Sequence, residues 1–220
     1  MRSGFIKALA AILLAGWLAC VACAESPAVA LVPDQEGYLP LFNGRDLAGW
    51  KVWKNQGDFQ IRDGIVRCQR GGDGQFMLYM GQEFADFELV VEWRVSPKGN
   101  SGVFIRSPFR EWPWDTGYEV QISNEQPPRD ETHCSGSLYG YAAVSPRPDE
   151  TPERWRTYRI RAVGNRITVA VDGTQVIDFD QSTTDKTRTK QMSGFIGVQD
   201  SHSGDEGTWV EYRTIKVKPL

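Results

Sequence analysis

The stretch DFELVVEWRVSPKGNSGVFIRSPFREWPWDTGYEVQI, residues 86–122, decides the fold. Within it, apolar residues recur at every second position over residues 86–95, 99–107 and 117–123, which is the period of a β-strand. The positions between them carry polar or charged side chains: Glu88, Glu92, Arg94, Asn100, Arg106, Glu119 and Gln121. We therefore expect three strands, each with one apolar face and one face that bears chemically capable side chains.

The rest of the chain continues this pattern of short strands joined by tight turns. Residues 59–69 and 166–179 each contain an Asp-Gly pair between two alternating segments. Asp-Gly supplies the positive φ angles that two-residue hairpin turns need, so both segments read as β-hairpins. Further strands are expected at 193–199 and 209–220. The sequence therefore predicts an all-β sandwich of two antiparallel sheets.

Two segments, 107–116 and 123–156, have the composition of loops. Long loops in a compact domain usually carry function, so we expect both at the rim of one sheet face. Trp112 and Trp114 lie in the first loop. They could stack on the ring of a ligand such as a sugar, or pack against the base of their own loop.

The N-terminal segment 1–24 reads as a secretory signal peptide. Two basic residues precede an apolar run that ends in Ala-Cys-Ala, and cleavage is expected after Ala24. The run is too short for a convincing membrane span. Cys20 and Cys23 leave a lipoprotein as an alternative. We therefore expect an exported protein, periplasmic or secreted, with membrane contact only if it is lipidated.

Residues 25–38 are interpreted as an export linker, and residues 39–220 as a single domain. The chain has 25 Lys and Arg against 28 Asp and Glu, a formal net charge of −3, and no basic run. This balance argues against a nucleic-acid partner. Cys68 and Cys134 fit either a disulfide or two separate thiols, and neither has the spacing of a zinc site.

Seven motifs in their order and spacing resemble the 3-keto-disaccharide hydrolase domain family, over about residues 36–220. They are LFNGRDLAGW (41–50), ADFELVVEWRV (85–95), GNSGVFIR (99–106), GYEVQIS (117–123), SGSLYG (135–140), VDGTQVIDF (171–179) and SGFIGVQDSH (193–202). The resemblance implies a concanavalin A-like jelly-roll sandwich with a concave polar cleft. It also implies an exported hydrolase that acts on small or oligomeric sugars already oxidised to a ketone at carbon 3.

A ketone at carbon 3 acidifies the hydrogen on carbon 2, so a base can form an enolate that expels the glycosidic oxygen, and water then adds. Such a site needs a base, a partner for the enolate oxygen and a proton donor. The catalytic candidates are Glu92, Arg106, Glu119 and His202, with Glu92 or Glu119 as base, Arg106 as oxyanion partner and His202 as acid, base or metal ligand. The substrate-binding candidates are Asn100, Ser101, Gln121, Tyr139, Gln199, Trp112 and Trp114. We expect Glu92, Arg106, Glu119 and Gln121 to point into one cleft.

Other interpretations stay open. Glu92 could be a solvated residue, and Arg106 could simply pair with an acid on a neighbouring strand. The resembled family tends to place its histidine one residue nearer to Gln199, where this chain has Ser201, which leaves the role of His202 open.

The related glucanases carry two acids two residues apart on the catalytic strand, whereas this chain has Glu119 and then Gln121. The chain therefore fits elimination better than ordinary glycoside hydrolysis. A glucanase-like hydrolase on unoxidised glycan and a noncatalytic carbohydrate-binding module remain the alternatives. The sequence assigns no cofactor, and a divalent cation held by oxygen ligands is compatible with it.

Overall fold

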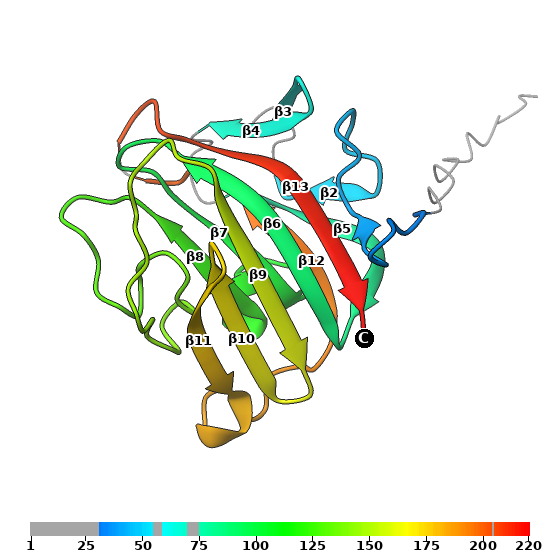
Figure 1. Cartoon of the computed structure of the whole chain (residues 1–220), viewed down its shortest axis with the longest axis vertical. Helices are drawn as coiled ribbons and strands as arrows, with labels where there is room; N and C mark the ends of the chain where they lie inside the picture. Colours follow the sequence, from blue (N-terminus) through cyan, green and yellow to red (C-terminus); the bar gives the residue numbers. More distant parts are fainter. Residues whose placement is uncertain (1–30, 55–58, 70–74, 204) are drawn as a thin grey trace, which may run out of the picture.

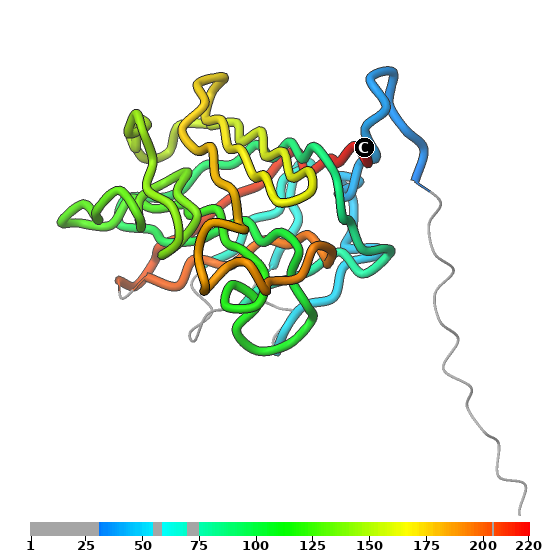
Figure 2. The backbone as a smooth tube through the Cα atoms, turned by 90° about the horizontal axis from the view of Figure 1, so that it is seen from below, coloured from blue at the N-terminus to red at the C-terminus, as the bar shows by residue number. Residues whose placement is uncertain are grey.

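The computed structural model describes residues 31–54, 59–69, 75–203 and 205–220. Two antiparallel sheets lie face to face, and the larger one is in front in Figure 1. Figure 2 shows the two layers from below, with the yellow β9 and β10 on one side and the orange β12 on the other. The predicted signal peptide 1–24 and residues 25–30 of the predicted linker lie outside the described residues. No described helix is long and apolar enough to cross a membrane.

The larger sheet has the strand order β11-β10-β9-β6-β13-β4-β3, and β1 also pairs with β13. Its strands are β1 (Leu39–Pro40), β3 (Phe59–Arg62), β4 (Ile65–Gln69), β6 (Phe87–Val95), β9 (Arg156–Val163), β10 (Arg166–Val171), β11 (Thr174–Asp180) and β13 (Trp209–Pro219).

The smaller sheet has the order β2-β5-β12-β7-β8. Its strands are β2 (Trp50–Val52), β5 (Phe76–Phe84), β7 (Asn100–Ser107), β8 (Tyr118–Ser123) and β12 (Gly194–Gln199). Two short helices lie between strands: α1 (Pro113–Thr116) between β7 and β8, and η2 (Gln181–Thr183) between β11 and β12. The predicted two-sheet antiparallel sandwich is confirmed.

The core lies between the two sheets and fixes which way each strand faces. Leu89 and Val91 on β6 belong to the same buried cluster as Val103 on β7 and Val120 on β8. Burying one such side chain contributes roughly 1.5–3 kcal/mol, so the alternation of each strand is strongly determined. The side of the smaller sheet that is turned away from the core, here called the outer face, therefore carries the residues between these apolar ones.

Both predicted Asp-Gly hairpins are present. Asp63 and Gly64 connect β3 to β4 with φ angles of 52° and 77°, and Asp172 and Gly173 connect β10 to β11 with φ angles of 49° and 86°. Two consecutive positive φ angles give a turn whose twist matches that of the flanking strands.

Cys68 and Cys134 are both buried and are not joined by a disulfide. Cys68 lies on β4 and Cys134 in the segment that follows β8. Of the two possibilities that the sequence left open, the structure has the separate thiols.

Candidate active site

The site is built around Glu119, which lies on β8 with its side chain on the outer face. Its cross-strand neighbour on β7 is Phe104. The Glu119 side chain extends over Gly102, where an added Cβ would lie 2.2 Å from the carboxyl Oε1. Only glycine at position 102 leaves room for this carboxyl group, so the two residues form one unit.

Burial changes the chemistry of Glu119. The residue is 4% exposed, and its carboxyl group makes no hydrogen bond or ion pair with any residue that the structure describes. Desolvation raises the pKa of Glu119 to about 8, against a weaker opposing effect of the positive charge of Arg129. At neutral pH this carboxyl group is therefore predominantly protonated and can donate a proton.

A row of polar residues crosses the sheet at Gly102. Gln121 on β8 pairs with Gly102, and the pairing of Val198 with Val103 places Gln199 of β12 on its other side. The backbone N–H of Gln121 donates to the carbonyl of Ser137, so the segment after β8 extends this row by one position.

Five buried polar atoms in this region have no hydrogen-bond partner among the described residues. They are Gln121 Oε1, Ser137 Oγ, Gln199 Oε1, Ser201 Oγ and His202 Nδ1. Buried polar groups are normally paired, because leaving one unpaired costs about 1–3 kcal/mol. Their gathering beside the Glu119 carboxyl indicates a surface that is built to bind a polar ligand.

A hydrogen-bonded relay holds one side of the site. Gln121 Nε2 donates to Asn100 Oδ1 at 3.0 Å, and Asn100 Nδ2 donates to Glu125 Oε2 at 2.9 Å. Arg129 pairs with both oxygens of Glu125, and its Nη1 donates to the Tyr139 hydroxyl at 3.2 Å. The relay fixes the orientation of the Gln121 amide and leaves its oxygen buried and unpaired among the described residues.

His202 stands close to this relay. Its backbone N–H donates to the carbonyl of Asn100 at 3.0 Å. The charges of Glu125 and Arg129 both act on the imidazole, so the ring lies near the relay. Burial lowers the pKa of His202 below 6.5, although the charge of Glu125 opposes this effect. The imidazole is therefore neutral at pH 7 and can accept a proton.

The other half of the outer face is aromatic. Phe104 packs edge-on against Phe76 with ring centroids 5.8 Å apart, and Trp114 stacks on Phe104 at 6.3 Å. Trp53 stacks on Phe76 at 5.6 Å, and Phe109 meets it edge-on. A flat apolar surface beside hydroxyl-binding groups is the usual composition of a sugar site.

Residues 37–218 match the sequence profile of a family described as the 3-keto-alpha-glucoside-1,2-lyase-like domain. The chain belongs to this family. A curated protein of Bacteroides thetaiotaomicron named 3-keto-disaccharide hydrolase is 25% identical over 246 aligned positions, which cover 90% of this chain and 83% of that protein.

Solved structures share the fold of this lyase-like domain. A Parabacteroides distasonis protein, provisionally described as a glycosyl hydrolase, superimposes with a TM-score of 0.70 at 19% identity, over 84% of this chain and 94% of that one. A carbohydrate-binding module from Bacillus subtilis superimposes with a TM-score of 0.54 at 13% identity, over 77% and 95% of the two chains.

The lyase-like domain brings several of the sequence-predicted residues together. Asn100, Gln121 and Gln199 lie with Glu119 at the polar part of the outer face, and the backbone of His202 is hydrogen-bonded to Asn100. Tyr139 adjoins them, because its backbone N–H donates to the carbonyl of Glu119. Trp114 borders the face through Phe104, whereas Trp112 is 57% exposed and touches Trp114 edge-on.

The prediction that Glu92 shares this cleft is wrong. Glu92 lies on β6 of the larger sheet and points away from the core, where its carboxylate pairs with Arg213 at 2.8 Å and accepts a hydrogen bond from Thr214. The whole thickness of the sandwich separates it from Glu119. The turn at 96–99 carries the chain from one sheet to the other, and the alternation pattern does not reveal such a crossing.

The prediction of Arg106 as an oxyanion partner is also wrong. Its backbone has a φ of 48°, and its fully buried side chain leaves the outer face for the end of the sandwich. There its guanidinium donates to the carbonyls of Ala85 at 2.8 Å and Gly164 at 2.9 Å and to Gln181 Oε1 at 3.3 Å. It joins the β5–β6 turn, the β9–β10 turn and Gln181 to β7.

Ser101 is the third correction among the predicted site residues. Its side chain faces the core, where the hydroxyl donates to the carbonyl of Gln199 at 2.8 Å and lies 2.8 Å from the Tyr212 hydroxyl. Ser101 shares its face with Val103, so the alternation itself places it away from a ligand.

Sequence reasoning missed Gly102, Glu125, Arg129 and Ser137 as parts of the site. Gly102 and Ser137 both lie inside motifs, GNSGVFIR and SGSLYG, but neither carries a charge that would single it out. Glu125 and Arg129 are spaced i, i+4 in a loop, a pattern that is ordinary for a surface ion pair. No three His, Cys, Asp or Glu side chains of the described ranges converge as metal ligands.

Proposed function

We propose that this protein cleaves glycosidic bonds of 3-keto-glycosides, by elimination beside the ketone followed by addition of water. Membership of the lyase-like family and the name of the Bacteroides relative support the substrate class. The observation that carries the proposal is that one relay adjoins both a carboxyl group whose pKa is raised and an imidazole whose pKa is lowered, and the charge of Arg129 acts on both. Environments that push two pKa values apart mark a general acid and a general base.

The geometry suggests a role for each group. The neutral His202 imidazole removes the proton on carbon 2, and the Glu119 carboxyl gives its proton to the glycosidic oxygen as the bond from carbon 1 to that oxygen breaks. The Ser137 hydroxyl donates a hydrogen bond to the oxygen on carbon 3 as charge develops there. In the hydration step, Glu119 takes a proton from the water that attacks carbon 1, and His202 returns its proton to carbon 2.

This assignment reverses one sequence-based expectation. The sequence suggested Glu119 as a base, which requires its ionised form at neutral pH. Burial over Gly102 favours the protonated form instead, so Glu119 is better suited to protonate the leaving group. His202 then remains the base.

Substrate orientation would come from the unpaired acceptors. Gln121 Oε1 and Gln199 Oε1 flank Gly102 and can accept hydrogen bonds from sugar hydroxyls. Trp114, which stacks on the buried Phe104, offers the adjacent ring surface. A sugar bound this way would lie over Gly102 with carbon 2 between His202 and Glu119.

A glucanase-like mechanism has less support. It requires a second carboxylate that can attack or activate water. Glu125 is the acid that the relay places on this side of the sheet, and both of its oxygens are already bonded to Arg129 or Asn100. A carboxylate held in this way positions its neighbours and is poorly placed to react.

The proposal is tested by incubating the purified protein with a 3-keto-disaccharide and with its unoxidised parent, each with and without a chelator. Turnover of the keto sugar alone is expected. Turnover of the parent at a similar rate would favour the glucanase alternative, and binding of either sugar without turnover would favour a noncatalytic module. Loss of activity with the chelator would add a divalent cation to the site.

Export is part of the same proposal. The basic and apolar pattern of residues 1–24 supports it. Mass spectrometry of the protein from its native cells should find a chain that begins after Ala24. A full-length chain in the cytoplasm would contradict export, and a lipid-modified cysteine would identify the lipoprotein form.

A further inference from the structure

A large pocket adjoins the aromatic side of the proposed active site. Its volume is about 770 Å³, and it lies between the segments 110–116, 139–141 and 186–191. Pockets of roughly 300–1,000 Å³ are typical of sites for small molecules. The space therefore accommodates a ring beyond the sugar that would lie over Gly102.

Two residues connect this pocket to Glu119. Tyr139, which lines the pocket, is the backbone neighbour of Glu119 at the edge of the sheet. Trp114, which also lines it, stacks on Phe104, the cross-strand neighbour of Glu119 on the other side. The proposed proton donor is therefore flanked by two residues that lead to the pocket walls, as expected where a leaving group departs.

The pocket has a rigid base. Lys190 Nζ donates to the carbonyls of Asp115 and Gly117, both at 2.6 Å, and lies over the rings of Tyr141 and Tyr118 at 4.4 Å and 4.8 Å. These contacts tie three separate segments together. With its donors engaged, Lys190 has a structural role here and leaves recognition to the rim.

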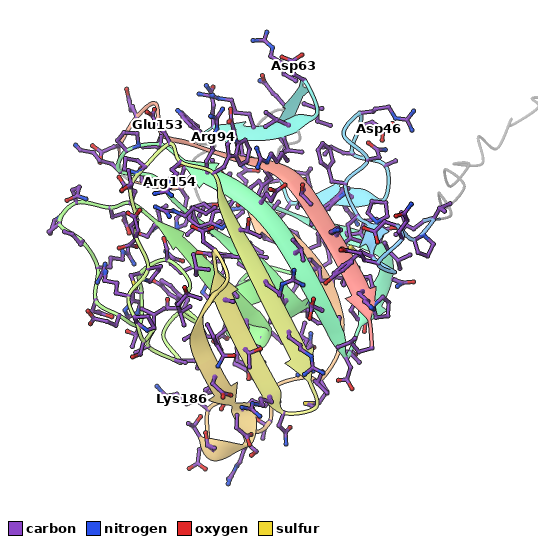
Figure 3. The ribbon with its side chains drawn as sticks, viewed as in Figure 1. Asp46, Asp63, Arg94, Glu153, Arg154 and Lys186 are labelled. Atoms are coloured by element: carbon purple, nitrogen blue, oxygen red, sulfur yellow. The ribbon has the colours of Figure 1, made fainter. Side chains whose placement is uncertain are left out.

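The rim carries unpaired positive charge. Arg110 donates to the Thr116 hydroxyl, but neither Arg110 nor Lys186 forms an ion pair with a carboxylate in the part of the chain that the structure describes. Asp115 is the one acidic side chain in the pocket lining. Figure 3 shows Lys186 projecting from the end of the sandwich, away from Arg94 and Glu153. The rim thus presents excess positive charge to whatever occupies the pocket.

We propose that this pocket binds the leaving group of the glycoside and favours one that carries a carboxylate, such as a sugar acid or an aryl acid. The inference rests on the proposed function, because it takes Glu119 as the donor to the leaving oxygen. Lys186 and Arg110 would attract the carboxylate, while Trp114 and Tyr141 would contact the ring.

The test uses two aryl 3-keto-glucosides that differ only in a para carboxylate or a para carboxamide on the leaving group. For each protein, the measured quantity is the ratio of kcat/KM for the carboxylate substrate to that for the carboxamide substrate. Comparing this ratio between proteins cancels the intrinsic difference between the two leaving groups. Lys186→Gln and Arg110→Gln should each lower the ratio about 3-fold to 10-fold, as expected for one partly screened charge.

The matched control is Arg161→Gln, which removes an exposed charge from β9 of the larger sheet. It should leave the ratio unchanged and keep activity on the carboxamide substrate within about twofold, as expected when only a distant surface charge is removed. An unchanged ratio in Lys186→Gln and Arg110→Gln, or an equal fall in Arg161→Gln, would overturn the pocket assignment alone. Absence of turnover of either substrate by the unmodified protein would overturn the proposed function as well.

Discussion

The chemistry of Glu119 depends on a neighbour that has no side chain. Gly102 leaves room for the carboxyl beside β7, where it is almost fully buried and has no bonding partner among the described residues. Burial destabilises the ionised form of this carboxyl group and raises its pKa to about 8. His202 shows the complementary effect, because the same burial disfavours its cationic form.

These opposite shifts predict a bell-shaped dependence of kcat/KM on pH. Activity should fall on the alkaline side near pH 8, where Glu119 loses the proton that it must donate. It should fall on the acidic side below pH 6.5, where His202 becomes protonated and cannot act as a base. Initial rates with a 3-keto-disaccharide between pH 5 and 10 measure both limbs. Activity that rises steadily through pH 8 would instead indicate that ionised Glu119 is the base.

Gly102→Ala should damage activity without preventing folding. The added Cβ would lie 2.2 Å from Glu119 Oε1, so the carboxyl must move, and a displacement of about 1 Å can cost about 100-fold in rate. In a Glu119→Gln background the same change should cost much less, because the positioned acid is already absent. Equal losses of activity in both backgrounds, or a large loss of thermal stability, would mean that Gly102 is needed for the conformation of β7 and not for the position of the carboxyl group.

At the level of elements, local turn chemistry allowed the two Asp-Gly hairpins to be predicted, since the turn residues alone determine the pairing of their strands. The alternation over residues 117–123 likewise identified Glu119 and Gln121 as sharing a face. Alternation could not show that β6 and β7, joined by a short turn, belong to different sheets, so Glu92 was placed with the wrong partners. That assignment depends on contacts between residues far apart in the chain.

Arg106 marks another limit of pattern reasoning, because its positive φ interrupts the strand and redirects its side chain. In the structure the Arg106 side chain stabilises the fold through its hydrogen bonds to two turns and to Gln181. Arg106→Met should lower the free energy of unfolding by about 3–5 kcal/mol, because two turns and Gln181 lose a charged donor. Urea unfolding measures the loss. Arg166→Met, which removes an exposed ion pair with Asp178, should have a far smaller effect.

A folded Arg106→Met protein with unchanged stability and abolished turnover would return Arg106 to the active site. Partial recovery of stability in Arg106→Lys, which keeps a charge but not the planar fork of donors, would agree with the structural role.

For the molecule as a whole, the two outward surfaces of the sandwich differ in kind. On the larger sheet the charged groups form ion pairs with one another. Glu211 pairs with Arg67 and Arg94, and both guanidinium groups lie over the ring of Trp209. The outer face of the smaller sheet presents unpaired acceptors, a buried acid and aromatic rings.

Sequence motifs identified the family and most of these polar residues. The loop partners Glu125, Arg129 and Ser137 depend on how the segment after β8 folds back on the sheet, which no local pattern encodes.

The most direct measurement compares Glu119→Gln with Glu92→Gln on a 3-keto-disaccharide, since each removes one carboxyl group and the two lie on opposite surfaces of the sandwich. With both variants folded, Glu119→Gln should lower kcat/KM by about 100-fold to 10,000-fold, as expected for loss of a general acid. Glu92→Gln should stay within about twofold of the unmodified protein, because only a partly exposed ion pair is lost. Full activity in Glu119→Gln, or a comparable loss in Glu92→Gln, would contradict the placement of the active site on the smaller sheet.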